Sequence, residues 1–313
     1  MTIGILGMGG VGSFIGATLA SHYQSDKNVR IIFICRNETK EVIQRDGLCL
    51  QSGDKKIIVH PSLVSDDPTE IGPLDILFVT TKSFSLLEAM EAYSECVTQK
   101  TILIPLLNGL DAKQLLSRNL ALDTSHILEG CIYVASNIKS PGIVAHVGGP
   151  GKIFFGDTQS KQYRDIENIL VKGGLDAVYT NDIKHILWKK FLFVSPLATM
   201  TAALDITFGQ LAKEFDHMAK LEALMTEVQA LALGFDINLT VKDIQESLAM
   251  LVRFPFESKS SLQLDIENGN NKTEKESFVD FVITQGYKVG TPVHHYEEMN
   301  QLIIERTKRV GKA

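Results

Sequence analysis

The sequence lacks three features that would assign it to a specialised class of protein. Its four cysteines contain no C-x-x-C pair, so neither a zinc site nor a redox pair is indicated. No apolar run approaches the ~20 residues that a membrane helix needs. There is no excess of positive charge, because 31 Lys+Arg against 37 Asp+Glu give a net charge of −6. This balance argues against general binding of nucleic acid or anionic lipid.

What is present is the composition of an ordinary globular chain. Of 313 residues, 44% are apolar and 22% are charged, which excludes disorder and fibrous repeats. The length suits two domains or one large α/β unit. A strand-like run begins at Thr2, directly after Met1, so we expect no targeting segment. Low cysteine use fits a reducing cytoplasm, and the sequence therefore predicts a cytoplasmic protein.

The first 180 residues alternate between short β-branched runs and helical or polar stretches, as parallel strands do in successive βα units. The predicted strands are 3–6, 31–35, 76–80, 102–107, 127–135, 143–146 and 153–155. The Ser140-Pro141-Gly142 turn predicts a hairpin after the fifth of them. We read 148–152, which is rich in glycine, as a second turn because it lacks the spacing of a phosphate loop.

After about Asp182 the pattern becomes continuously helical. The predicted helices include 183–203, 241–252, 259–266, 275–285 and 293–306. Between the first and second of these we predict an amphipathic helix that ends at Gly234. Its apolar face carries Leu211, Phe215, Met218, Leu221, Met225 and Val228. Thr291 and Pro292 are expected as the N-cap and first residue of the last predicted helix. The sequence predicts an α/β fold, with an α/β domain at 1–180 followed by an all-helical domain at 181–313.

A glycine-rich loop directly follows the first predicted strand. Its residues, Gly7, Met8, Gly9, Gly10, Val11 and Gly12, fit G-x-G-x-x-G and open a helix expected from Ser13. The first glycine permits a tight turn, the second lets backbone approach a pyrophosphate, and the third lets the helix pack on the strand. This context favours a Rossmann-type dinucleotide-binding domain at 1–180 over a glycine-rich turn that binds nothing.

The end of the second predicted strand bears on the choice of dinucleotide. An acidic residue there would bind the ribose 2′-hydroxyl of NAD, but the chain has Arg36 and no Asp or Glu. A guanidinium suits a 2′-phosphate by its charge and its fork of donors. Arg36 therefore favours NADP, the alternative being an ordinary solvated arginine.

Two adjacent lysines lie in the first predicted helix of the second half. The residues three and four positions from Lys190 are Ile186, Leu187, Phe193 and Val194. Lys190 is therefore expected to be partly buried, with a depressed pKa that suits proton donation. Lys189 reaches the surface more easily. The alternative is that Lys190 extends its ammonium group to water.

These residues and their order resemble the ketopantoate reductases (2-dehydropantoate 2-reductases) over nearly the whole chain. The short motifs that carry the resemblance are Gly7–Gly12, Arg36, 79–82, 107–109, 187–190, Ser260-Ser261 with Asp265, and Thr273-Glu274. The resemblance implies reduction of 2-dehydropantoate (ketopantoate) to pantoate, a step of pantothenate biosynthesis, by hydride transfer from NADPH.

The resemblance also implies roles for single residues. Lys190 matches the lysine that protonates the ketone oxygen, and Glu274 a glutamate near the reacting end of the cofactor. Asn108 matches an asparagine beside the nicotinamide ribose and the substrate. Arg36 and Lys82 match residues on the adenosine side, and Ser261 matches a serine that holds the substrate carboxylate. The residues allow structural readings too: Thr273 can cap a helix that Glu274 enters, Ser260 and Ser261 can cap or start one, and Asn108 can sit in a turn.

The chain departs from the family at three positions. Where the family commonly has asparagines that contact the substrate, this chain has Val194 and Ala198, and Phe208 stands where the family has a further asparagine before a glycine. Losing amides makes the expected pocket more apolar, and hydrogen-bonding sites discriminate strongly for the groups they bind. A paralogue that reduces another small 2-oxo acid is therefore the alternative function, and a non-catalytic NADPH-binding sensor is a second one.

The expected partner is a small-molecule 2-oxo acid, with no nucleic acid and no membrane, and a homodimer stays open. No metal site is expected. His294 and Glu298 lie one helical turn apart, but no third ligand accompanies them. We therefore read that pair as part of a solvated polar face.

Overall fold

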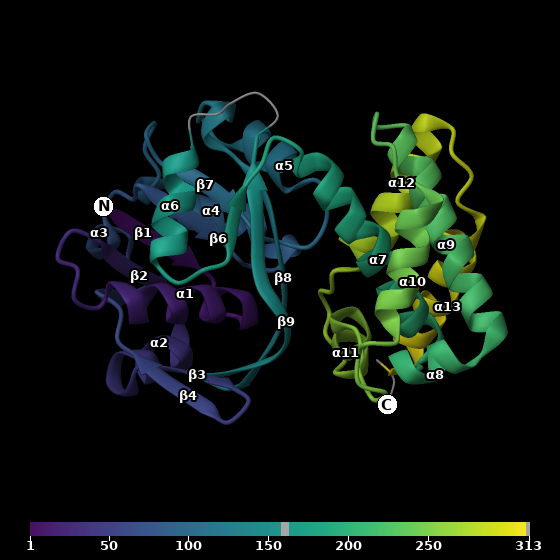
Figure 1. The fold of residues 1–313 in the computed structure, drawn as a ribbon, viewed down its shortest axis with the longest axis horizontal. Helices are drawn as coiled ribbons and strands as arrows, with labels where there is room; N and C mark the ends of the chain where they lie inside the picture. Colours follow the sequence, from purple (N-terminus) through teal and green to yellow (C-terminus); the bar gives the residue numbers. More distant parts are fainter. Residues whose placement is uncertain (158–162, 311–313) are drawn as a thin grey trace. The chain divides into compact units, whose positions relative to one another are not determined.

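The computed structural model describes residues 1–157 and 163–310. The chain divides into two compact units, Met1–Ile183 and Lys184–Ala313 (Figure 1). The first unit is mixed α/β and the second is helical. Each has its own buried core and is described separately.

The central sheet of the first unit is fully parallel. Its strands are β1 (Thr2–Leu6), β2 (Arg30–Ile34), β5 (Leu63–Ser65), β6 (Ile76–Val79) and β7 (Ile102–Pro105), in the order β5-β2-β1-β6-β7. The predicted strands at 3–6, 31–35, 76–80 and 102–107 are confirmed to within two residues. Their runs are apolar throughout because both faces of the sheet are covered.

Alternate side chains of this sheet enter two different cores. Ile3 and Ile5 pack with Ile15 of helix α1 (Gly10–Tyr23), whereas Leu6 and Leu77 belong to the core on the other face. The helices of this unit other than α1 are α2 (Asn37–Asp46), α3 (Pro68–Ile71), α4 (Leu86–Ala92), α5 (Ala112–Asn119) and α6 (Arg164–Lys172). Short 3₁₀ turns lie at Ser83–Ser85, Ser94–Cys96 and Thr124–His126. The helix after the glycine loop begins at Gly10, three residues before the predicted Ser13.

A second, mixed sheet covers the α1 side and was not predicted. It contains β3 (Leu48–Ser52), β4 (Lys55–Val59), β8 (Glu129–Ser140), β9 (Ile143–Gly156) and β10 (Ala177–Tyr179), in the order β10-β9-β3-β4 with β8 paired to β9. The predicted hairpin is confirmed, because β8 and β9 pair antiparallel on either side of Pro141-Gly142.

The predicted turn at 148–152 is wrong, and 143–146 and 153–155 are parts of one strand, β9. Gly149 (φ +77°) and Gly151 (φ +71°) adopt left-handed backbone inside that strand. The register of β8 against β9 shifts between Tyr133 and Ala135, opposite this stretch. The glycines therefore form an irregularity within a continuous ladder, which glycine allows because it has no Cβ.

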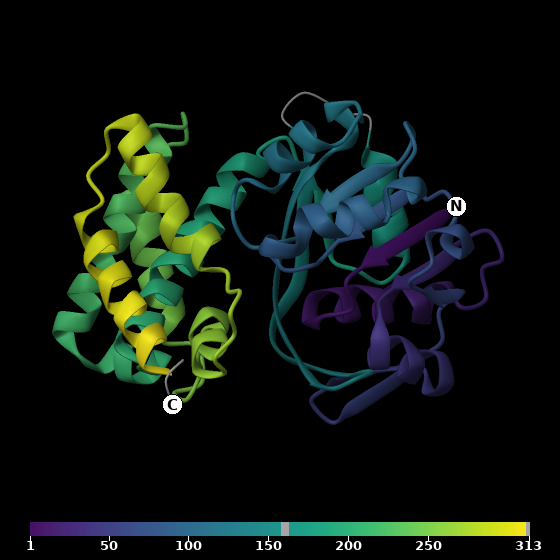
Figure 2. The ribbon, with the colours of Figure 1, turned by 180° about the vertical axis from the view of Figure 1, so that it is seen from behind.

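The second unit consists of helices. These are α7 (Ile183–Leu204), α8 (Phe208–Lys213), α9 (Phe215–Leu233), α10 (Val241–Leu251), α11 (Ser261–Glu267), the π-helical turn η4 (Glu276–Asp280), α12 (Phe281–Val289) and α13 (His294–Val310). Figure 2 shows α13, in yellow, on the near side of this unit. Among the described residues, none of the helices combines the length and apolar character needed to cross a bilayer.

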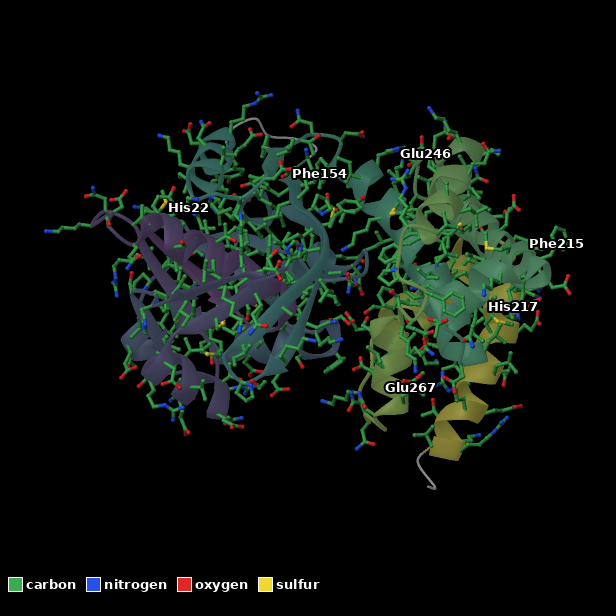
Figure 3. The ribbon with its side chains drawn as sticks, turned by 60° about the horizontal axis from the view of Figure 1, so that its bottom comes forward. His22, Phe154, Phe215, His217, Glu246 and Glu267 are labelled. Atoms are coloured by element: carbon green, nitrogen blue, oxygen red, sulfur yellow. The ribbon has the colours of Figure 1, made fainter. Side chains whose placement is uncertain are left out.

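The single helix predicted around Leu211 to Gly234 is in fact two helices, α8 and α9. The chain leaves helical geometry at Glu214, the N-cap of α9. Phe215, predicted on the apolar face, is 85% exposed and projects outward (Figure 3). From Leu221 onward the apolar stripe is buried as predicted, and Gly234 caps the helix end.

The last helix begins at His294 and not at the predicted Pro292. Its first turn is capped by a carboxylate distant in sequence: Glu227 of α9 accepts hydrogen bonds from the backbone N–H groups of His295 (2.8 Å) and Tyr296 (3.1 Å). The predicted cap at Thr291 is therefore wrong. The buried carboxylate of Glu227 accepts hydrogen bonds at the start of α13, where the hydroxyl of Thr291 was expected to accept them.

Candidate active site

The glycine loop is built as the sequence predicted, and each motif glycine has a separate reason. Gly7 adopts φ +96° and donates its N–H to the carbonyl of Ile34, at the end of β2 (3.1 Å). A Cβ on Gly12 would lie 2.0 Å from the carbonyl oxygen of Gly7, so only glycine lets α1 approach β1 this closely. A Cβ on Gly9 would meet nothing within 4 Å. Gly9 thus faces open space, as backbone that must approach a ligand does.

A cavity of about 290 Å³ opens beside this loop. Its walls include Leu6, Gly7, Met8, Ile34, Cys35, Arg36, Asn37, Thr39, Thr81, Ser85, Glu88, Ala89, Ala92 and Tyr93. The cavity lies at the carboxyl ends of β1, β2 and β6, where open parallel sheets bind ligands. Within residues 1–157 and 163–310, the buried hydroxyl of Thr81 has no hydrogen-bond partner, and α1 begins without a side-chain cap or an acidic first turn. An open glycine, an unpartnered hydroxyl and a free helix N-terminus fit a dinucleotide phosphate.

Arg36 lies at the rim of this cavity and is exposed, at the N-cap position of α2. One turn on, Lys40 pairs with Asp66 at 2.7 Å. The side-chain hydrogen bond to Asp66 raises the pKa of Lys40, so its charge is already partnered within the protein. Burial raises the pKa of the neighbouring Cys35 thiol to about 12, so it stays neutral. Arg36 is therefore an exposed cation beside the cavity at the end of β2, and its contact with a 2′-phosphate stays a prediction.

The other predicted residues of this unit follow neighbouring strands. Lys82 is exposed and comes three residues after β6, and Asn108 is half-buried and comes three residues after β7. Gly109, next to Asn108, has φ +109°, so the chain turns there as the alternative reading expected. Because β1, β2, β6 and β7 are parallel, Gly7, Arg36, Lys82 and Asn108 all belong to one edge of the sheet.

In the helical unit, the two lysines of α7 lie in different surroundings. The ammonium group of Lys189 lies 2.8 Å from the carboxylate of Asp243 and 2.7 Å from that of Glu246. The hydrogen bond to Asp243 raises the pKa of Lys189 most, and the one to Glu246 raises it further. Lys190 is half-buried, and Leu187 and Phe193, three residues to either side, are buried. The predicted partial burial of Lys190 is what the structure shows. Its depressed pKa stays a prediction.

The remaining predicted residues of this unit begin short helical segments. Ser260 is the N-cap of α11, its hydroxyl accepting from the N–H of Gln263 (3.1 Å), and Ser261 is the exposed first residue of that helix. Glu274 is 3% exposed, and its carbonyl accepts from the N–H groups of Ser277 and Phe278 where η4 begins. Thr273 accepts from the N–H of Lys275 (3.3 Å), and among the described residues η4 begins without a side-chain cap.

The positions without asparagine lie on or beside the Lys190 helix. Val194 is half-buried and Ala198 is buried, one and two turns after Lys190. Phe208, buried in α8, meets Phe254 edge to face (5.4 Å between centroids), and Phe254 stacks on Phe193 of α7 (5.8 Å). Sequence reasoning missed this aromatic cluster and the buried hydroxyl of Thr81. The Phe254-Pro255-Phe256 run and the Thr80-Thr81 pair were the available signals.

No group of three metal-ligating side chains occurs within 1–157 and 163–310. His294 is 83% exposed at its side chain and lies 3.5 Å from Glu297, and Glu298 pairs with Lys220 at 2.6 Å. Glu298 thus serves a surface ion pair with Lys220.

The parallel sheet, its glycine loop and the cavity beside it define a Rossmann-type dinucleotide-binding protein joined to a helical unit. The family model "Ketopantoate reductase PanE/ApbA" matches residues 3–160, and "Ketopantoate reductase PanE/ApbA C terminal" matches residues 182–307. The chain therefore belongs to the ketopantoate reductase family. It is an NADP-dependent oxidoreductase of the kind that acts on CH–OH and C=O groups.

Individual relatives are distant but match end to end. An uncharacterised oxidoreductase of Bacillus subtilis is 23% identical, covering 91% of this chain and 92% of its own. A 2-dehydropantoate 2-reductase of Halobacterium salinarum is 24% identical, covering 94% and 95%. The crystal structure of a PanE/ApbA family ketopantoate reductase from Ralstonia eutropha has a TM-score of 0.88 at 21% identity over 99% of both chains. The structure of D-mandelate dehydrogenase with NADH and anilino(oxo)acetate has a TM-score of 0.84 at 17% identity, also over 99% of both chains.

Proposed function

We propose that this chain reduces 2-dehydropantoate to pantoate with hydride from NADPH, and that Lys190 donates the proton. The observation that carries the proposal is the partial burial of Lys190 in α7. Lys190 is half-buried, and Leu187 and Phe193, three residues to either side of it, are buried. An ammonium group in apolar surroundings is suited to stabilise a developing alkoxide and then to transfer a proton to it.

The residues of the first unit are proposed to bind the cofactor. Gly7–Gly12 and the N-terminus of α1 would hold the pyrophosphate, Arg36 and Lys82 the adenosine side, and Asn108 the nicotinamide ribose and the substrate. The open position of Gly9 and the unpartnered Thr81 hydroxyl support this assignment. NADPH, when bound, supplies the hydride, and the protein supplies binding and orientation.

The residues of the helical unit are proposed to act on the substrate. Lys190 would protonate the ketone oxygen, and Ser261, exposed at the start of α11, would bind the carboxylate. Glu274, buried at the start of η4, would lie near the reacting end of the cofactor. A fixed cation at the developing negative charge lowers the barrier because it needs no reorganisation during the reaction.

A second candidate substrate is a 2-oxo acid with an apolar substituent. Val194, Ala198 and Phe208 offer no amide, and Phe208 joins Phe254 and Phe193 in an aromatic cluster beside α7. A hydroxylated substrate would leave polar groups without partners against such a surface. The similarity in fold to D-mandelate dehydrogenase shows that this architecture occurs in a dehydrogenase of another name.

A panel assay tests these proposals. The full-length protein is mixed with NADPH and, in turn, 2-dehydropantoate, pyruvate, a branched aliphatic 2-oxo acid and phenylglyoxylate, and oxidation of NADPH is followed by its absorbance. A kcat/KM highest for 2-dehydropantoate supports the first candidate, and one highest for an apolar acid supports the second. Tight binding of NADPH without turnover of any member would contradict both and favour a non-catalytic sensor.

We further propose a cytoplasmic enzyme, and a homodimer remains a hypothesis that the mass in solution tests. A monomeric mass from light scattering at micromolar concentration would reject the dimer. The four cysteines, which lie in the described part of the chain, are free thiols, as expected in a reducing compartment.

A further inference from the structure

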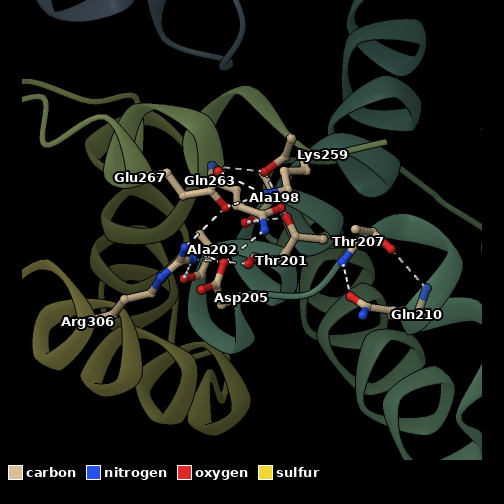
Figure 4. Close-up of polar contacts among 11 residues, drawn as sticks. Ala198, Thr201, Ala202, Asp205, Thr207, Gln210, Lys259, Gln263, Glu267 and Arg306 are labelled. Atoms are coloured by element: carbon tan, nitrogen blue, oxygen red, sulfur yellow. Dashed lines mark hydrogen bonds and ion pairs between the residues drawn. The ribbon is translucent and has the colours of Figure 1, made fainter. Parts of the chain in front are cut away.

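Arg306, near the end of the chain, joins three segments of the helical unit (Figure 4). Its side chain is 12% exposed. One guanidinium nitrogen donates to the carbonyl of Ala202 (2.8 Å), in the last turn of α7. The other pairs with Asp205, just after α7, and with Glu267, the last residue of α11 (3.3 Å). The planar fork of arginine suits this task because it presents several donors in fixed directions.

A chain of buried hydroxyls makes a second connection between the same two helices. The N–H of Gln263 donates to Ser260 Oγ (3.1 Å), and Ser260 Oγ lies 2.8 Å from Thr201 Oγ1. Thr201 in turn donates to the carbonyl of Leu197 (3.0 Å). The Thr201 and Ser260 hydroxyls therefore share one hydrogen bond between α7 and the start of α11. Thr201 and Ser260 are both buried, so water does not compete for their hydroxyl groups.

Both ends of α11 are thereby fixed to α7. The hydroxyl chain holds the first turn of α11, beside Ser261, and Arg306 holds its last residue. Lys259, just before α11, also bonds Glu267 (2.9 and 3.0 Å), so the carboxylate of Glu267 is shared by two cations. The cluster of Arg306, Lys259, Asp205 and Glu267 balances two positive charges with two negative ones.

This arrangement matters because α7 also carries Lys190. In a 2-oxo acid the carboxylate and the ketone lie on adjacent carbons, so the groups that bind them must keep a fixed separation. α7 runs without interruption from Lys190 to Thr201, with Pro196 inside it, and α11 is attached to its far end. A shift of α11 would move Ser261 relative to Lys190, and misplacement of this kind lowers catalytic efficiency.

We propose that Arg306 is a positioning residue that sets the place of Ser261, and with it the carboxylate of the 2-oxo acid, relative to the Lys190 helix. The proposal rests on the function proposed above. It assigns Arg306 no contact with the substrate. It predicts a defect in binding of the 2-oxo acid that spares binding of NADPH.

The test compares R306Q and R306K with R309Q in the full-length protein. Arg309 is the matched control because it lies one turn further along the same helix. Its side chain is 77% exposed and pairs with Glu305 of that helix. KM and kcat are measured with the panel member that the wild type reduces best. The Kd of NADPH is measured by fluorescence titration and the Tm by scanning calorimetry.

We expect R306Q to lower kcat/KM about 10- to 100-fold, mainly through KM. R306K keeps the charge but loses the fork, so we expect a smaller loss of the same kind. The Kd of NADPH should change less than ~2-fold in both, and R309Q should match the wild type.

T201V, which removes the hydroxyl link and keeps the side-chain shape, decides the matter if R306Q does not fold. It should raise KM for the 2-oxo acid several-fold and leave the Kd of NADPH unchanged. Unchanged kinetics in T201V and in every folded Arg306 variant, with only Tm lowered, would overturn the inference while leaving the proposed function intact. An Arg306 variant that weakens binding of NADPH as much as binding of the 2-oxo acid would overturn the inference as well. Absence of turnover by the wild type would instead reject the proposed function.

Discussion

At the scale of single residues, Lys189 and Lys190 show how one helical step changes the surroundings of a side chain. Successive residues on a helix point about 100° apart. Lys189 therefore reaches the carboxylates of α10, while Lys190 lies on the stripe with Val194 and Ala198. The residue type alone does not distinguish them, but the spacing of apolar neighbours does.

Replacement of Lys190 tests its proposed role directly. K190A should lower kcat by about 10²–10⁴-fold, the usual contribution of a positioned proton donor, and leave NADPH binding nearly unchanged. K184A, an exposed lysine at the start of the same helix, is the control and should retain full activity. A K190A enzyme with wild-type kcat would assign Lys190 to structure alone.

The glycines of the cofactor loop should separate binding from stability. A Cβ at Gly9 meets no protein atom, so G9A should keep the wild-type Tm but weaken NADPH at least about tenfold, because the methyl group would occupy space proposed for the pyrophosphate. A Cβ at Gly12 would lie 2.0 Å from the Gly7 carbonyl, so G12A should lower Tm as well. Calorimetry and fluorescence titration measure the two effects. Wild-type affinity in G9A would mean that the loop does not approach the cofactor.

At the scale of elements, the start of α10 carries a strongly perturbed carboxylate. Burial of Asp243 opposes its charged form, but hydrogen bonds from Lys189 and Thr240 outweigh this and lower its pKa from 3.8 to about 2. Because the folded-state pKa lies below the unfolded one, the stabilisation is complete above about pH 5 and is lost as the pH falls toward 2. Its size follows from the shift and is about 2 kcal/mol.

Replacement of Asp243 should reveal this contribution. D243N should lower the free energy of unfolding by about 2 kcal/mol at pH 7, measured by urea denaturation, and the difference from wild type should shrink below pH 4. E246Q removes the more exposed partner of Lys189 and should have little effect. A D243N deficit that is the same at pH 3 and pH 7 would show that packing, and not the charge, is responsible.

Elements also show where local patterns stop being sufficient. The alternating runs predicted the parallel strands, and the apolar stripe from Leu221 predicted most of α9, because each depends on residues within a few positions. The start of α13 was placed wrongly because its cap, Glu227, comes from another helix. The structural alternative put Glu274 at the start of an α-helix, but a π-helical turn follows it.

At the scale of the whole molecule, the net charge of −6 makes the placement of a few cations important for a phosphorylated cofactor. Binding that favours the folded state raises Tm in proportion to RT ln(1 + [L]/Kd). Arg36 is exposed beside the cavity, whereas Lys40 and Arg45 are already paired with Asp66 and Asp46. Selectivity for NADPH over NADH is therefore expected to depend on Arg36.

Thermal unfolding with each dinucleotide tests this expectation. NADPH at 100 times its Kd should raise Tm by about 5 °C, and the same concentration of NADH should raise it less. R36A should weaken NADPH about 10- to 100-fold, the value of a charge-assisted hydrogen bond, and leave NADH nearly unaffected. R45A, in the same helix, should behave as wild type. Equal losses for both dinucleotides in R36A would reject a contact with the 2′-phosphate.

The sequence by itself determined the parallel strands, the glycine loop, the change to helices near residue 180 and the face on which Lys190 lies. All of these depend on spacing within one or two turns or one strand, so the local pattern is sufficient. Only the tertiary structure decided that β9 is one strand of a second sheet, that Glu227 caps α13, and that Arg306 fixes α11 to α7. Those contacts join residues tens of positions apart in the sequence. Their energies come from charges and hydroxyls that become neighbours, and are shielded from water, only once the chain has folded.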